Sequence, residues 1–220
     1  MRSPNFGDRR DGLRPELVVL HYTAMTDCAG AARALCDPAR EVSAHYLIGR
    51  DGHVFELVDP ALRAWHAGQG SWRGAGDVNS RSIGIELDND GATPFSEPLM
   101  AALQSLLAAL LADHRIAPEG VIGHSDMAPG RKIDPGRRFD WKRLARQGLA
   151  VWSEASGDVA DAEAFRRDAT AFGYGEMGDE LLLDVMRMRF RPWARGPLDG
   201  RDCAVMADLA RRYGRPLVGT

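Results

Sequence analysis

Apolar residues in the first two thirds of the chain form short runs that predict β-strands. Residues 17–20 are all apolar, include two adjacent valines and lead directly into His21, which is the pattern of a buried strand. Residues 46–48 and 53–57 flank an Asp-Gly pair suited to a tight hairpin, so these two strands should be antiparallel neighbours. Two further strands are expected, at 82–87 and 121–124.

Helical spacing appears between these strands. A long helix is predicted by the leucines at positions 99, 103, 106, 107, 110 and 111. Ser96 is a suitable N-terminal cap for this helix, because Glu97 and Pro98 follow it in the first turn. A shorter helix is expected over residues 29–35. Residues 1–147 therefore predict an α/β fold, in which a mixed central β-sheet carries helices on its faces.

The last third of the chain has a different pattern. Periodicity fades over residues 148–158, where Ser, Gly and Glu appear, and we interpret this segment as a linker. Three helical segments follow, at 160–172, 178–190 and 199–213, the last of them ended by Gly214. The predicted organisation is a catalytic domain at 1–147, a linker at 148–158 and a small three-helix domain at 159–220.

Composition and charge narrow the class of partner. The chain has 220 residues, of which 45% are hydrophobic, enough to bury a core. Its 28 basic and 31 acidic residues give a net charge of −3 and show no long run of one sign. This balance argues against nucleic acid as the main partner.

The N-terminus and the apolar stretches bear on the compartment. The first ten residues are polar and lack the apolar core and cleavage site of a secretory signal. The longest apolar stretch, 99–112, contains Gln104 and Ser105 and is shorter than the ~20 residues that span a bilayer. We therefore expect a cytoplasmic protein without a membrane partner. A chain that follows a removed signal or lipid anchor would be periplasmic, and that alternative stays open.

Three candidate metal ligands lie where strands end or loops begin. These are His21, His124 and Asp134, the last ten residues beyond the second histidine. Two imidazoles and one carboxylate leave the fourth tetrahedral position of Zn²⁺ free for water, which is the arrangement of a catalytic zinc site. Such a metal lowers the pKa of its water and polarises a substrate carbonyl.

Two further residues suit the proton transfer and charge stabilisation that amide hydrolysis requires. Glu86 follows the apolar residues Ile83 to Ile85, where a partly buried carboxylate has a raised pKa and serves as acid and base. Lys132 stands two residues before Asp134, so an extended segment would turn both side chains to one side. Each residue alone is more often structural, and only the ordered set of patterns supports the site.

The local motifs around these residues resemble a known family. They are VLHYT at 19–23, VSAHYLI at 42–48, RAWHAG at 63–68, SIGIEL at 82–87 and GHSDMAPGRKIDPG at 123–136. In this order they look like the N-acetylmuramoyl-L-alanine amidase family that includes the anhydro-muropeptide amidases. The similarity covers residues 4–145 and implies a fold related to peptidoglycan recognition proteins.

The resemblance implies a role for each matching position. His21, His124 and Asp134 would bind zinc, and Glu86 and Lys132 would assist catalysis. Further candidates have two interpretations each. Trp65 and His66 would line the substrate groove, although His66 also suits a hydrogen-bonded structural role. Asn79 and Arg81 are candidates to contact the stem peptide's carboxylate, or to form a surface ion pair.

The C-terminal segment resembles the three-helix peptidoglycan-binding module of some of these amidases, more weakly than the first part resembles the catalytic domain. The alternative is a helical cap that packs on the catalytic domain. The motifs thus predict a monomeric zinc amidase that cleaves the bond between N-acetylmuramic acid and L-alanine in peptidoglycan fragments, with Glu86 activating the water.

Two rival functions remain. One is a non-catalytic peptidoglycan receptor on the same fold, which would be expected to lack part of the metal set. The other is a zinc peptidase, since the same chemistry would serve any amide. The helix motif His-Glu-x-x-His of many zinc peptidases is absent from the sequence.

Overall fold

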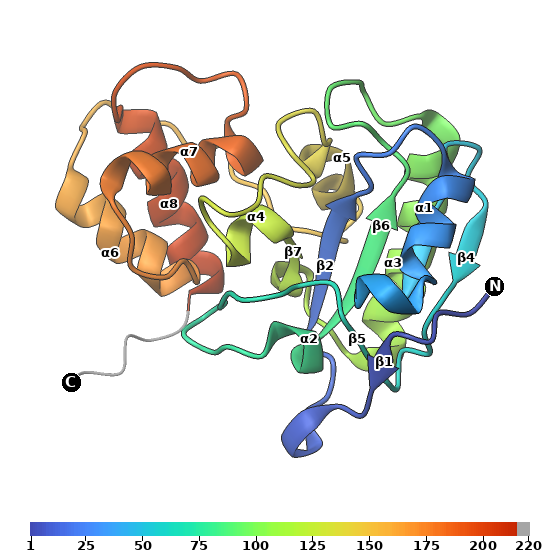
Figure 1. The fold of residues 1–220 in the computed structure, drawn as a ribbon. Coiled ribbons are helices and arrows are strands. Elements are labelled where there is room, and N and C mark those ends of the chain that lie inside the picture. The colour runs from blue at the N-terminus through green and yellow to red at the C-terminus, as the bar shows by residue number, and fades with distance from the viewer. Residues whose placement is uncertain (215–220) are drawn as a thin grey trace.

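A five-stranded mixed sheet forms the centre of the molecule (Figure 1). The structure, a computed structural model, describes residues 1–214. The strands lie in the order β4-β3-β6-β2-β7, and only the β3–β4 hairpin is antiparallel. Their bounds are β2 Leu17–Tyr22, β3 Tyr46–Ile48, β4 Val54–Glu56, β6 Ser82–Leu87 and β7 Val121–Gly123. The predicted mixed α/β class is confirmed.

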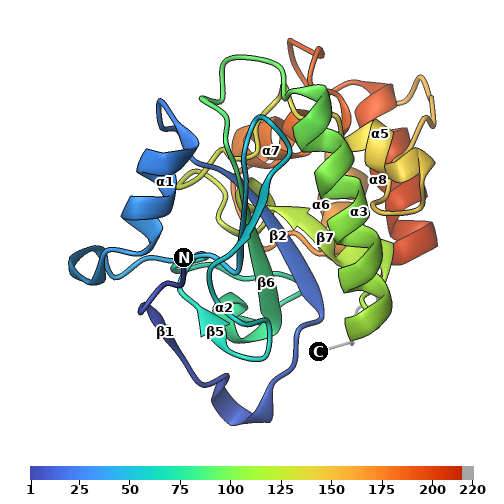
Figure 2. The ribbon, with the colours of Figure 1, turned by 90° about the vertical axis from the view of Figure 1, so that its right-hand side faces the viewer.

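Helices cover both faces of this sheet (Figure 2). On one face, Val18 and Leu20 of β2 and Ile83 and Ile85 of β6 pack against the leucines of α3 (Glu97–His114). On the opposite face, α1 (Cys28–Leu35) covers the β3 side of the sheet. The remaining elements are β1 Phe6–Gly7, β5 Arg63–Ala64, α2 Val78–Arg81, α4 His124–Met127 and α5 Trp141–Arg146.

The alternation of the strands decides which side chains face the functional side. Side chains two residues apart on a strand share a face. Because Val18 and Leu20 face α3, His21 lies on the opposite face with Leu17 and Val19. The same parity places Ser82, Gly84 and Glu86 of β6 on that opposite face. The face that lacks α3 therefore carries His21 and Glu86.

Two strand boundaries and one helix cap differ from the sequence-based expectation. The first strand of the predicted hairpin agrees, but β4 is shorter than 53–57, and His124 begins α4 rather than ending β7. Ser96 stands at the N-cap of α3 without a side-chain cap, because its hydroxyl donates to the carbonyl of Arg50. A tertiary contact thus replaces the expected local one.

The three C-terminal helices agree closely with the predicted segments. They are α6 Ala162–Phe172, α7 Asp179–Phe190 and α8 Gly200–Tyr213. Asp161 and Asp199 cap α6 and α8 through their side chains, which satisfies backbone N–H groups that have no partner inside the helix. Residues 215–220 of the predicted domain lie outside the described residues.

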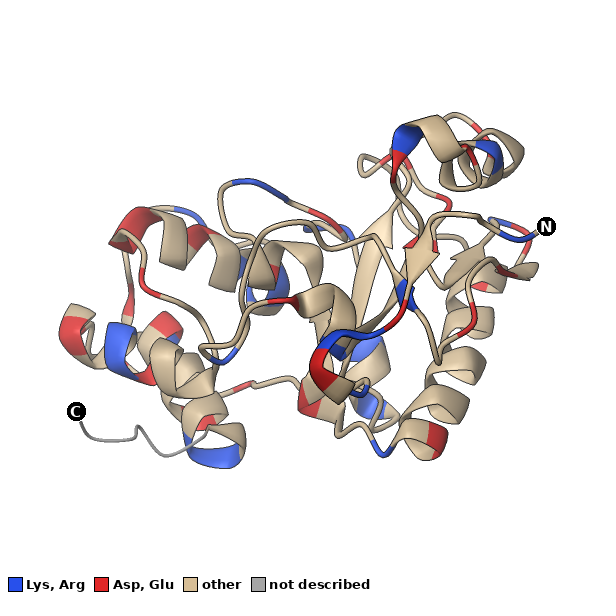
Figure 3. Ribbon diagram, turned by 60° about the horizontal axis from the view of Figure 1, so that its bottom comes forward, with Lys and Arg blue, Asp and Glu red and all other residues tan. Residues whose placement is uncertain are grey.

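These helices share a core with the sheet. One continuous cluster joins Leu17, Val19 and Trp72 to Phe172 and Leu209 among other buried residues. Charged residues of both signs are interspersed over the ribbon (Figure 3). Within residues 1–214, no helix is both long and apolar enough to cross a bilayer.

Candidate active site

The three predicted metal ligands meet at one edge of the sheet. β2 and β7 are parallel neighbours, so their carboxyl ends lie together. His21 stands near the end of β2, and His124 follows β7 as the first residue of α4. Asp134 returns to this edge because the backbone N–H of Ser125 donates to its carbonyl at 2.9 Å. Sheet topology thus brings together residues 113 positions apart.

Their ligand atoms converge on one point. Nδ1 of His21 lies 2.9 Å from Nδ1 of His124 and 2.9 Å from Oδ2 of Asp134, and the His124 and Asp134 atoms are 3.0 Å apart. Two ligands on a tetrahedral zinc ion, with bonds of about 2.0–2.1 Å, are roughly 3.3 Å apart. All three side chains are almost fully buried. The spacing is close to that of a zinc site.

Hydrogen bonds on the far side of each imidazole set its tautomer. Nε2 of His124 lies 2.9 Å from the carbonyl of Ala67, which can only accept, so this nitrogen carries the proton. Behind His21, the Ser82 hydroxyl donates to the Val78 carbonyl and therefore accepts from Nε2 of His66. His66 then offers Nδ1 to the N–H of His21 at 3.0 Å.

With both outer nitrogens protonated, the two inner nitrogens and the Asp134 carboxylate are three acceptors facing one another. A bound cation satisfies all of them, so the donor set fits a zinc ion. Burial, together with the nearby His124, lowers the pKa of His21 to about 4 and keeps it neutral, as a ligand must be.

Glu86 lies beside this group. It pairs in register with His21 across β2 and β6. The side chain opens on the cleft, yet its Oε2 atom is buried and has no hydrogen-bond partner among residues 1–214. Burial raises the pKa of Glu86 to about 8, with a further contribution from the charge of Asp134 and an opposing one from Lys132. A carboxyl group in this state can both take and return a proton near neutral pH.

A cleft of about 580 Å³ lies over these residues. Its lining includes the three ligands and Glu86, as well as Lys132, Trp65 and His66. One wall is formed by Ala31, Ala34 and Leu35 of α1, which face the loop that carries Lys132. The structure therefore brings seven of the nine predicted site residues to one cleft.

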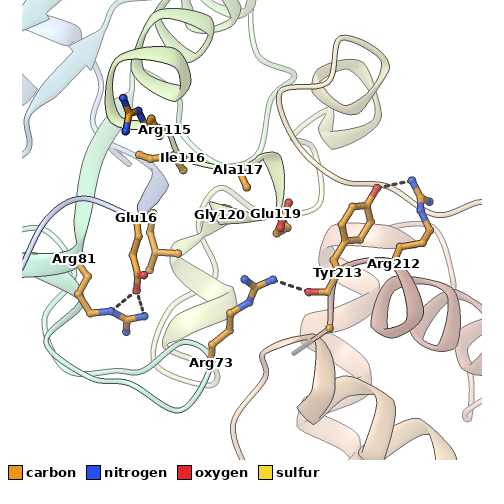
Figure 4. A pocket seen from close by; sticks show the side chains of 12 residues that line it. Glu16, Arg73, Arg81, Arg115, Ile116, Ala117, Glu119, Gly120, Arg212 and Tyr213 are labelled. Carbon is orange, nitrogen blue, oxygen red and sulfur yellow. Dashed lines mark hydrogen bonds and ion pairs between the residues drawn. The ribbon is translucent and has the colours of Figure 1, made fainter. Parts of the chain in front are cut away.

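The other two predicted site residues lie outside that lining. The Asn79 side chain accepts from the backbone N–H groups of His66 and Ala67, at 3.0 and 2.8 Å. Arg81 is buried, pairs with Glu16 and donates to the carbonyl of Ala75. It borders a different pocket, shown in Figure 4. Their substrate contacts stay a prediction, and the structure shows each side chain hydrogen-bonded within the protein.

Sequence reasoning missed several supports of the site. Ser82 and the carbonyl of Ala67 act behind the two histidines, and Gly84 leaves room for the ring of His66, which a Cβ at Gly84 would approach to 2.4 Å. Arg131 donates to the Ala67 carbonyl at 2.7 Å and also lines the cleft. For Ser82 and Gly84, the signal available in the sequence was that alternate residues of a strand share a face, which places both beside Glu86.

A mixed α/β domain in which two histidines and one aspartate converge beside a buried glutamate has the donor set of a metal-dependent hydrolase. The family model described as N-acetylmuramoyl-L-alanine amidase matches residues 11–137. The chain belongs to this family.

Individual relatives extend the similarity over nearly the whole chain. N-acetylmuramoyl-L-alanine amidase AmiD of Escherichia coli is 32% identical over 236 aligned positions, covering 92% of this chain and 84% of that protein. The structure of AmiD from E. coli with anhydro-N-acetylmuramic acid-L-Ala-D-gamma-Glu-L-Lys has a TM-score of 0.83, with 93% and 92% of the two chains covered and 32% identity. AmpDh3 from Pseudomonas aeruginosa, in complex with anhydromuramic pentapeptide, has a TM-score of 0.77 at 30% identity and covers 98% and 96%.

Proposed function

We propose that this protein is a zinc-dependent amidase that hydrolyses the bond between N-acetylmuramic acid, in its anhydro form among others, and L-alanine in peptidoglycan fragments. The observation that carries the proposal is the convergence of three acceptor atoms within 3.0 Å of one another, beside a carboxyl group whose pKa is raised. Family membership supports the choice of the muramyl amide, and the AmiD and AmpDh3 complexes with anhydromuramyl peptides support the substrate class.

The residues of the chain divide the reaction between them. His21, His124 and Asp134 would hold the zinc ion, which would supply Lewis-acid chemistry toward the substrate carbonyl and water. Glu86 accepts the proton of the attacking water and returns it to the nitrogen of L-alanine as the amide bond breaks. Lys132, on the loop over the cleft, stabilises the negative charge that develops on the carbonyl oxygen.

Two further residues of the cleft, Trp65 and His66, have roles in the same proposal. Trp65 offers an aromatic face inside the cleft, suited to the apolar face of a sugar ring or a stem residue. His66 supports His21 from behind as well as bordering the cleft. We retain as proposals the division at residues 148–158, a peptidoglycan contact by the C-terminal helices, a monomeric state and a cytoplasmic location.

The test uses a purified anhydro-muropeptide and its reducing-end counterpart. Each is incubated with the protein as prepared, after chelation, and after zinc is restored, and products are identified by mass spectrometry. The expected result is a free peptide that begins with L-alanine, lost on chelation and regained with zinc. Intact substrates under all conditions, with measurable binding, would instead favour the receptor. Cleavage inside the stem peptide would favour the peptidase.

A further inference from the structure

A buried ionic network connects the C-terminal helices to β7 and α4, the short helix that begins with His124. Its members are Asp126 on α4, Tyr174 just after α6 and Arg189 on α7, none more than 2% exposed. One carboxylate oxygen of Asp126 accepts from the Tyr174 hydroxyl at 2.8 Å. The other accepts from Arg189 at 2.7 Å and from the backbone N–H of Gly123 at 2.7 Å.

Arg189 holds the segment from Val121 to Asp126 at two points. Besides its bond to Asp126, it donates to the carbonyl of Val121 on β7 at 2.9 Å. Its guanidinium lies 4.4 Å from the ring centre of Trp141, which excludes water from one side of the group. The two acceptors stand three residues before and two residues after His124. The guanidinium therefore spans the turn in which this ligand sits.

The turn needs such support because it is too short to hold itself. α4 has four residues, and the amide of Ala128 donates to the carbonyl of His124 to close its single turn. One isolated helical turn is unstable alone, since its few hydrogen bonds do not offset the entropy of ordering. A rigid external partner is therefore the natural means of fixing the direction of the His124 ring.

The same helices brace the loop that supports His124 from its other side. Trp72 packs edge-on against Tyr174, with ring centres 5.3 Å apart. The neighbouring Arg73 donates to the carbonyl of Tyr213 at the end of α8 (Figure 4). Ser71 donates its backbone N–H to the carbonyl of Met127. The loop from Ala67 to Arg73 is thus held between α4 and the C-terminal helices.

We propose that the C-terminal helices position the metal centre, with Arg189 and Tyr174 acting through Asp126 to orient His124. Residues 162–213 then belong functionally to the catalytic unit, whatever else they bind. Removing a partner that orients a metal ligand typically weakens metal binding about 10- to 100-fold. The inference rests on the zinc site of the proposed function, so the test measures zinc affinity of the unaltered protein first.

Arg187 provides a matched control on the same helix. It is 4% exposed, compared with 2% for Arg189, and it too is paired with a buried carboxylate, that of Asp202. Its other bonds go to the carbonyls of Gly196 and Pro197, within the C-terminal region. Arg187→Lys therefore disturbs the helices to a similar degree without touching the Asp126 network.

The experiment measures the dissociation constant for zinc by competition with a chromophoric chelator, well below the melting temperature of each metal-free protein. Arg189→Lys should bind zinc about 10- to 100-fold more weakly. Tyr174→Phe should have a smaller defect in the same direction. Arg187→Lys should lower the melting temperature but keep the zinc affinity of the unaltered protein.

The possible results distinguish failure of the positioning role from failure of the zinc centre. Equal zinc affinity in all folded variants, or equal losses for Arg187→Lys and Arg189→Lys, would overturn the positioning role. If Arg189→Lys does not fold, Tyr174→Phe decides, because it removes one hydroxyl group and retains the ring. Absence of zinc binding by the unaltered protein would refute the zinc centre itself, which is a separate failure.

Discussion

The candidate metal site and the C-terminal helices both contain buried charged groups, but the hydrogen bonds to those groups differ. In the helices, Asp202 receives hydrogen bonds on both carboxylate oxygens, from Arg187, Arg191 and the backbone of Asp199. At the site, Glu86 keeps an oxygen without a partner among the described residues. Nearby, three acceptor atoms face one another.

The difference separates a structural network from a reactive one. A buried polar group without partners costs free energy, so it persists where a ligand or a reaction uses it. The Asp202 carboxylate, with both oxygens paired, holds one conformation and leaves no free oxygen to react. Burial of charge alone therefore does not identify a functional site. Here the unpaired oxygen of Glu86 lies beside three converging acceptor atoms in one cleft, and the combination marks the site.

The largest expected effect is on turnover at the reactive network. Glu86→Gln should lower kcat by about 10²–10⁴-fold, because the amide preserves shape but cannot carry the proton. Zinc affinity should change far less, since Glu86 is not among the three ligands. Steady-state kinetics on the anhydro-muropeptide check the first expectation, and chelator competition checks the second. A Gln variant with near-normal kcat would remove Glu86 from the mechanism.

The paired network should respond in stability rather than in turnover. Asp202→Asn leaves the Arg187 and Arg191 guanidinium groups without their buried carboxylate, and such a break costs about 3–5 kcal/mol. Urea unfolding should show this loss, while kcat per folded molecule stays unchanged. An equal fall in kcat at a temperature where the variant is fully folded would contradict the separation between the two networks.

An intermediate effect is expected at His66, which belongs to the support of the site. His66→Ala removes the acceptor for the N–H of His21 and should weaken zinc binding about 10-fold. The exposed His53, on the hairpin, serves as the control, and His53→Ala should bind zinc normally. If both variants bind zinc alike, the hydrogen bond behind His21 has no part in metal affinity.

A pH dependence is also expected in the metal-free protein. The pKa of Glu86 is raised by burial from an ordinary 4.5 to about 8, so the folded state binds more protons than the unfolded state between these values. Stability from this group is complete below about pH 4.5 and declines as pH rises to about 8. Glu86→Gln should remove that decline. The same change in unfolding free energy between pH 5 and pH 8 in the unaltered protein and in Glu86→Gln would contradict this expectation.

Residue patterns alone predicted the mixed sheet, the three C-terminal helices and the three candidate metal ligands that the structure brings together. Apolar runs and leucine spacing depend on local burial, which leaves a periodic trace in the chain. His21 and His124 were found because a polar residue that follows a short apolar run marks a strand end. The order of the motifs added support for Asp134, Glu86 and Lys132, all of which line the cleft.

Only the tertiary structure decided which groups these polar side chains bond to across the fold. From the sequence, Asn79 and Arg81 suit a substrate contact and a surface ion pair equally well. In the structure Asn79 accepts from the backbone of a loop, and Arg81 donates to Glu16. Ser96 donates to Arg50 instead of capping its helix, and Arg189 reaches an aspartate 63 positions away. A polar side chain shows in sequence what it can bond to, but packing chooses among all the groups that can satisfy it.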